Sequence, residues 1–180
     1  MPFLLYVPHN ILLNVYHALF SSHMRYNCQV WGLTNTYITS RIHILQKAAV
    51  RIMTFSEFRA HSAPLFARLK ILSIFDLVKV LNILFVHQVL NKKVPDEVSN
   101  YFQFTMKKHA HNTRESFAGC LEIPNVNTSS YGISSLRYQS ISAWNYISRS
   151  CVDSIETQLI NRRHSSVKRL ITNHFLSLYN

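Results

Sequence analysis

The segment YITSRIHILQKAAVRIM, residues 37–53, combines an apolar and a basic pattern on one predicted helix. Its apolar residues recur at steps of three and four, the spacing of an amphipathic helix with one buried face. That predicted buried face consists of Ile42, Leu45, Ala49 and Ile52, joined by Ile44, Ala48 and Met53. The segment therefore predicts a helix that packs against a core.

The same helix carries a basic row. His43, Lys47 and Arg51 follow one another at four-residue steps, and residues at that spacing are neighbours on a helix surface. No Asp or Glu precedes Glu57, so the row has no local carboxylate partner. We expect it to face solvent, a distant acid or a phosphate.

The composition indicates a globular protein with a large positive net charge. The 180 residues are 48% apolar and 15% charged, enough for one core or for one core with a smaller appendage. Nineteen Lys and Arg oppose eight Asp and Glu, a formal net charge of +11. Such a balance makes nucleic acid the leading class of partner, although it also fits a solvated surface without a partner.

The sequence predicts neither a signal peptide nor a transmembrane segment. The apolar start is interrupted by prolines, asparagines and histidines, and no run of eighteen apolar residues occurs elsewhere. The three cysteines, Cys28, Cys120 and Cys151, are too few and too widely spaced for a disulfide framework. We expect an intracellular protein, in the cytoplasm or the nucleus, that does not bind membranes.

The N-terminal part of the chain is predicted to be helical. Helices are expected over residues 10–28, 64–70 and 74–90, with Gly32 ending the first hairpin element. Ser73 and Asp76 form an S-x-x-D capping pattern at the start of the helix over 74–90. That helix is the most apolar of the three, and we expect it in the core.

The C-terminal part changes character after residue 104. Residues 105–116 are basic with almost no apolar content, and residues 117–123, FAGCLEI, have the pattern of a short strand. Helices are expected over 133–147 and 154–178. The chain is thus predicted to be mainly α: a helical domain over 1–104, a basic connector over 105–116, and a small mixed α/β or irregular C-terminal unit over 117–180.

Catalytic chemistry has little support in the residues. His109 and His111 are the one close histidine pair, and they lack a carboxylate or thiolate at ligand spacing. No phosphate-binding glycine loop occurs, and no cysteine or serine lies in a nucleophile motif. We expect no enzyme activity, no cofactor, no bound metal and no small-molecule substrate.

Seven pieces of the chain, in order, match a known pattern. They are LFSSHMRYNCQVWG (19–32), LQKAAVRIM (45–53), RAHSAPLF (59–66), LKILSIFDL (69–77), HNTR (111–114), SLRYQ (135–139) and WN (144–145). In this order and spacing they resemble the C-terminal part of reverse transcriptases of non-LTR retrotransposons (LINE elements) of the jockey-like kind. The resemblance covers about residues 10–176.

The resemblance implies a helical thumb-like bundle and the region that follows it, which in such polymerases grips template and primer. The palm is missing, since no Asp-Asp pair that could hold two catalytic metal ions occurs in the sequence. The expected function is therefore non-catalytic binding of RNA or an RNA–DNA duplex, with a polymerase palm as a second possible partner.

The residues expected to contact phosphates are His43, Lys47, Arg51, Arg59, Lys107 and Lys108. The alternative is an inactive structural remnant or a truncated gene model without independent activity. In that case Leu12, Tyr16 and Phe20 would lie on an exposed apolar patch left by a lost partner. A membrane-surface helix at the N-terminus is disfavoured, because residues 1–20 contain no Lys or Arg.

Overall fold

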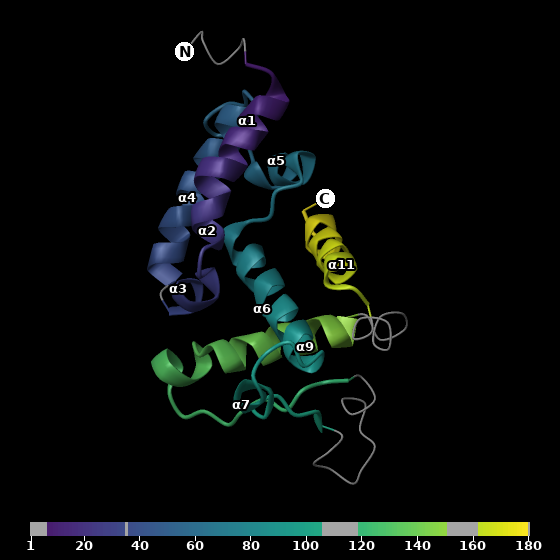
Figure 1. Ribbon diagram of the computed structural model, residues 1–180. Helices are drawn as coiled ribbons and strands as arrows, with labels where there is room; N and C mark the ends of the chain where they lie inside the picture. The colour runs from purple at the N-terminus through teal and green to yellow at the C-terminus, as the bar shows by residue number, and fades with distance from the viewer. Residues whose placement is uncertain (1–6, 35, 106–118, 151–161, 180) are drawn as a thin grey trace. The chain divides into compact units, whose positions relative to one another are not determined.

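The computed structural model describes residues 7–34, 36–105, 119–150 and 162–179, and the predicted mainly α class is confirmed (Figure 1). The elements are α1 (His9–Val15), the π-helical η2 (Tyr16–Ser21), α2 (Ser22–Arg25), α3 (Cys28–Thr34), α4 (Thr36–Met53), α5 (Ser62–Leu69), α6 (Ile74–Leu90), α7 (Asp96–Ser99), η4 (Ser129–Ile133), α9 (Leu136–Ser150) and α11 (His164–Ser177). Within these described ranges, no helix has both the length and the apolarity needed to cross a bilayer.

The chain forms two compact units. Unit 1 comprises Met1–Leu77 and His174–Asn180, and unit 2 comprises Val78–Asn173. Both α6 and α11 therefore contribute one end to each unit. The predicted connector over 105–116 falls almost wholly on residues outside the described ranges, so that domain boundary stays a prediction.

The first predicted helix is divided into several pieces. α1, η2 and α2 follow one another to Arg25, and the chain then turns at Asn27, whose φ is +50°. Asparagine is one of the few residues other than glycine that adopt this conformation readily. α3 runs through Gly32, so the prediction that Gly32 ends the element is wrong.

The helix α4 forms as predicted, but its predicted buried face is wrong. Figure 1 shows α1 beside α4 in unit 1. Leu45 is 61% exposed and Ile52 is 50% exposed, whereas Gln46 is completely buried. The buried positions of α4 are Thr39, Gln46, Val50 and Met53. Apolar residues occur on nearly every side of this helix, so their spacing alone did not determine which side is buried.

Gln46 explains why this face is the inner one. Its Nε2 donates to the Tyr16 hydroxyl (3.0 Å) and to the Leu72 carbonyl (2.8 Å), and its Oε1 accepts from the Ile74 N–H (2.9 Å). A buried amide is tolerated where its hydrogen bonds are satisfied. One side chain thus joins η2, α4 and the start of α6.

The start of α6 is capped as predicted. The Ser73 hydroxyl donates to Asp76 Oδ2 (2.7 Å), and the Asp76 N–H donates to the Ser73 hydroxyl (3.3 Å). α6 spans the predicted residues Ile74–Leu90, and its side chains Leu77, Val80 and Leu84 are buried. The capping pattern and the apolar run together fixed this element correctly.

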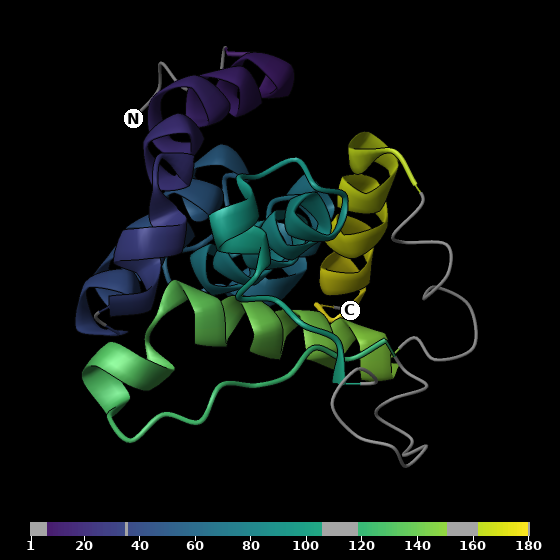
Figure 2. The ribbon, with the colours of Figure 1, turned by 60° about the horizontal axis from the view of Figure 1, so that its bottom comes forward.

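In unit 2 an extended segment runs beside α9 (Figures 1 and 2). The helix α9 begins at Leu136, three residues later than predicted. The sequence predicts a strand over 117–123. In the described part of that segment, residues 119–123, Leu121 instead forms an isolated antiparallel bridge with Phe104. Asn145 of α9 accepts from the Leu121 N–H and donates to the Leu121 carbonyl, both at 2.8 Å. The Asn145 side chain thus provides the two backbone hydrogen bonds that a neighbouring strand would otherwise make.

Candidate nucleic-acid interface

His43 is half-buried in unit 1, as are Lys47 and Arg51. Its ring stacks on Phe66 (centroids 6.0 Å apart, 15° between planes) and meets the edge of Phe75 (5.2 Å). Burial lowers the pKa of His43, and the charge of Lys47 lowers it further. Its buried Nδ1 has no hydrogen-bond partner. The rings of Phe66 and Phe75 cover part of His43, and its predicted phosphate contact stays a prediction.

Three further predicted site residues, Lys47, Arg51 and Arg59, belong to unit 1. Lys47 and Arg51 are half-buried, and Arg59 is exposed. Arg51 Nε donates to the Ala60 carbonyl (3.0 Å), which ties the last turn of α4 to the loop that carries Arg59. We name these three residues the α4 basic surface. Arg51 lies in the last turn of α4, where the helix dipole favours a cation.

Acidic groups near this surface are scarce. Residues 1–77 contain seven Lys and Arg but only two acids, Glu57 and Asp76. Asp76 Oδ2 accepts hydrogen bonds from both the Ser73 hydroxyl and the Tyr179 hydroxyl. Since Asp76 is engaged at the start of α6, Glu57 is the one exposed carboxylate in this stretch.

The Tyr179 hydroxyl fixes the end of the chain to unit 1. Besides donating to Asp76, it accepts from the Ser73 N–H at 3.0 Å. Burial, with the Asp76 hydrogen bond next in size, raises the pKa of Tyr179 to about 12. The phenol is thus neutral throughout the physiological range.

Lys107 and Lys108 lie outside the described residues, so their predicted role stays a prediction. The structure draws attention instead to four cations that the sequence reading did not single out: Arg162, Arg163, Lys168 and Arg169, all exposed at or just before α11. The signal that could have found them is the absence of any Asp or Glu after Glu156.

Groups for catalysis are sparse in the described parts of the chain. There, no three His, Cys, Asp or Glu side chains come together as a metal site requires. Cys28 and Cys120 are buried, and burial raises the pKa of the Cys28 thiol to about 11. The Cys28 thiol is therefore protonated at neutral pH, the unreactive form.

A shallow hollow of about 350 Å³ lies in unit 2, lined by Ile123, Ser142, Asn145, Tyr146 and Arg149. None of these residues is a carboxylic acid, histidine or cysteine, and the Asn145 amide is already bonded to Leu121. The hollow therefore does not supply an acid–base pair.

The candidate site is a cationic surface on a helical scaffold, formed by Lys47, Arg51 and Arg59. Comparison of the chain with protein-family models, with curated proteins and with solved structures found no match.

Proposed function

We propose that this chain is a non-catalytic nucleic-acid-binding fragment of a non-LTR retrotransposon reverse transcriptase, thumb-like in its N-terminal part. Its ligand is RNA or an RNA–DNA duplex, held through phosphates by the α4 basic surface, with Lys107 and Lys108 as further predicted contacts. The observation that supports the proposal is that these cations lie within residues 1–77, a stretch that contains only two acids. The resemblance of seven ordered pieces to that family supports the identity of the ligand.

Arg51 is suited to a phosphate contact because its side chain is already oriented. Its Nε–H is used by the Ala60 carbonyl, which fixes the plane of the guanidinium group. The terminal nitrogens still carry donors that can bind phosphate oxygens in a fork. Ordering the side chain before binding reduces the entropy lost on association.

Lys47 and Arg59 extend the same surface. Lys47 lies one helical turn before Arg51, and Arg59 lies next to the carbonyl that Arg51 binds. Such contacts position a duplex without reading its sequence. We therefore expect affinity that depends strongly on salt and little on base sequence.

The test is fluorescence anisotropy with a labelled RNA–DNA duplex at several salt concentrations. Lys47→Gln/Arg59→Gln removes two phosphate contacts and leaves Arg51, which also supports the fold. We expect the salt slope to fall by roughly 2 in magnitude. The matched control, Arg25→Gln/Arg41→Gln, removes the same charge from exposed side chains away from the last turn of α4. Equal effects of the two variants would contradict the α4 basic surface as the site.

A second candidate function is favoured by the exposed apolar side chains of unit 1. α4 exposes Ile44, Leu45 and Ile52, and the N-terminal helices expose Ile11, Val15 and Leu19. These residues fit the reading of the chain as an inactive remnant whose apolar faces have lost a partner.

The exposed apolar residues of the N-terminal helices are not the ones expected, which were Leu12, Tyr16 and Phe20. Tyr16 is only 5% exposed, and Leu12 and Phe20 are half-buried. Analytical ultracentrifugation of Leu45→Gln/Ile52→Gln tests this candidate. Loss of concentration-dependent association in the variant supports it, and a wild-type chain that stays monomeric without aggregation contradicts it.

A further inference from the structure

We infer that Phe55 and Phe58, in the loop between α4 and α5, stack on an unpaired base of the nucleic acid that the α4 basic surface binds. We name these two side chains the loop aromatic pair. The inference rests on the proposed function and deepens it. It adds that the ligand carries a single-stranded stretch beside its duplex.

The loop aromatic pair is exposed to solvent. Phe58 is 88% exposed and Phe55 is 50% exposed, although both belong to a residue type that is usually buried. The other residues of the loop, 54–60, are polar or small. Phe58 in particular makes almost no contribution to the core, so its role is not explained by packing.

Phe55 has a backbone conformation that usually belongs to glycine. Its φ is +53°. The Phe55 N–H donates to the Ile52 carbonyl (3.2 Å) and the Ser56 N–H donates to the Arg51 carbonyl (3.0 Å), as in a Schellman motif at a helix end. Glycine is the commonest residue at this position, and a bulky aromatic residue is strained there. Strain of this kind is concentrated at functional contacts, so an exposed ring on a strained residue indicates a ligand.

Arg51 holds the loop at both ends. Its carbonyl accepts from the Ser56 N–H, and its Nε donates to the Ala60 carbonyl (3.0 Å). The Ala60 N–H donates to the Glu57 carbonyl (3.0 Å), which closes a turn around Phe58. The loop aromatic pair is therefore carried on backbone that is ordered before binding, and this lowers the entropy lost on association.

The residues beside the rings favour a nucleotide as the ligand. Arg51 precedes the loop aromatic pair and Arg59 follows it. Proteins that bind single strands combine cations along the phosphates with aromatic rings on which bases stack. Glu57, exposed between the two rings in sequence, opposes a phosphate there, so we assign the base to the rings and the phosphates to the cations. A base within a duplex is covered by its neighbours, so the stacked base is an unpaired one.

The experiment uses the full chain and two labelled ligands of equal charge. One is an RNA–DNA duplex with a short single-stranded extension, and the other has abasic sites throughout that extension. We expect the wild type to bind the ligand with bases about tenfold more tightly, because only the bases differ. Phe58→Ala should reduce this preference to less than about twofold. It should leave the salt slope unchanged, since the ring carries no charge.

Phe55→Gly separates a binding role from a structural one. Glycine adopts positive φ without strain, so we expect an equal or higher urea midpoint together with a smaller preference for the ligand with bases. A lower midpoint with an unchanged preference overturns the role of Phe55. If both the midpoint and the preference fall, Phe58→Ala decides, because that ring is almost wholly exposed.

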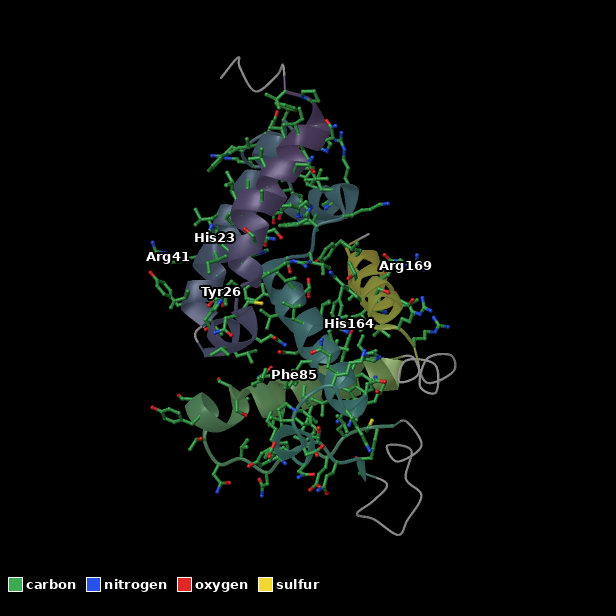
Figure 3. All side chains as sticks on the ribbon, viewed as in Figure 1. His23, Tyr26, Arg41, Phe85, His164 and Arg169 are labelled. Atoms are coloured by element: carbon green, nitrogen blue, oxygen red, sulfur yellow. The ribbon has the colours of Figure 1, made fainter. Side chains whose placement is uncertain are left out.

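Tyr26→Ala is the matched control for the loss of an exposed ring. Tyr26, labelled in Figure 3, is 81% exposed at the end of α2 and follows Arg25. It precedes α4 in the chain, whereas the loop aromatic pair follows α4. The control should keep the wild-type preference. An equal loss of preference in Tyr26→Ala and Phe58→Ala overturns the inference, because any exposed aromatic ring would then suffice.

The remaining outcomes separate this inference from the proposed function. Equal binding of both ligands by the wild type, with weaker binding of both by Lys47→Gln/Arg59→Gln, overturns the inference and leaves the α4 basic surface in place. A preference that depends on Phe58, with no effect of Lys47→Gln/Arg59→Gln, supports the loop aromatic pair and overturns the α4 site. Self-association that Phe58→Ala abolishes, without any preference for bases, also overturns the inference and assigns the rings to a protein interface.

Discussion

The helices α4 and α6 have similar lengths and are both rich in apolar residues, yet they bury these residues differently. In α6 the buried side chains include the apolar residues Leu77, Val80 and Leu84. In α4 the apolar Leu45 is mostly exposed, and its neighbour Gln46 is completely buried. The difference shows that a polar side chain whose amide makes three hydrogen bonds can define the inner face of a helix against the apolar pattern.

The largest expected effect is that of Gln46→Leu. The substitution leaves the Ile74 N–H, the Leu72 carbonyl and the Tyr16 hydroxyl without their partner in a buried site. We expect the free energy of unfolding to fall by roughly 3–5 kcal/mol, measured by urea denaturation. The neighbouring substitution Leu45→Gln should change it by no more than about 0.5 kcal/mol. If Leu45→Gln were the more damaging of the two, the assignment of the faces would be wrong.

Asn145→Ala tests whether unit 2 uses the same principle. It removes both hydrogen bonds to Leu121 and leaves that backbone unpaired in a buried position. A loss of about 2–4 kcal/mol in unfolding free energy is expected. Ser142→Ala, on an exposed position of the same helix, is the control and should have little effect. A small effect of Asn145→Ala would show that the segment around Leu121 is held by apolar packing instead.

Tyr179→Phe should have a smaller effect, about 1–2 kcal/mol, because the lost hydroxyl is only partly buried. The raised pKa of Tyr179, about 12 against an ordinary 10, means that the fold favours the neutral phenol. Its contribution is complete below pH 10 and is lost as the pH rises toward 12. Urea midpoints of wild type and Tyr179→Phe should therefore converge over that window. Tyr131→Phe, at an exposed position, should follow the wild type.

The smallest expected effect concerns His43. Because its pKa is lowered in the fold, the unfolded chain takes up this proton first as the pH falls below about 6.5. Stability contributed by neutral His43 is thus present at neutral pH and is lost on acidification. His43→Gln should reduce the difference between urea midpoints at neutral and mildly acidic pH. An unchanged pH dependence in His43→Gln would show that His43 is not the group responsible.

The sequence predicted those elements whose signals are local. The capping pair Ser73 and Asp76 and the apolar run after it defined α6 to the residue, because both signals act within a few positions. The sequence predicts the N-terminal break at Gly32 and not at Asn27, since glycine is the commoner residue at positive φ.

Features that depend on distant partners were not predictable in the same way. The partners of Gln46 lie at least 26 residues away, so its burial leaves no trace in the periodicity of α4. In the candidate site, His43, Lys47 and Arg51 are all half-buried and Arg59 is exposed. The contacts of His43 with Phe66 and Phe75 depend on residues more than twenty positions away, so the sequence pattern of α4 did not predict them.

The salt dependence of wild-type binding to the RNA–DNA duplex tests the central claim most directly. If cations and not the exposed apolar side chains of α4 hold the ligand, each phosphate contact adds about 0.9 to the slope of log affinity against log salt. With at least two contacts, affinity should fall about tenfold or more between about 50 and 200 mM salt. An affinity that stays constant or increases over this range would contradict the account and assign binding to the apolar face.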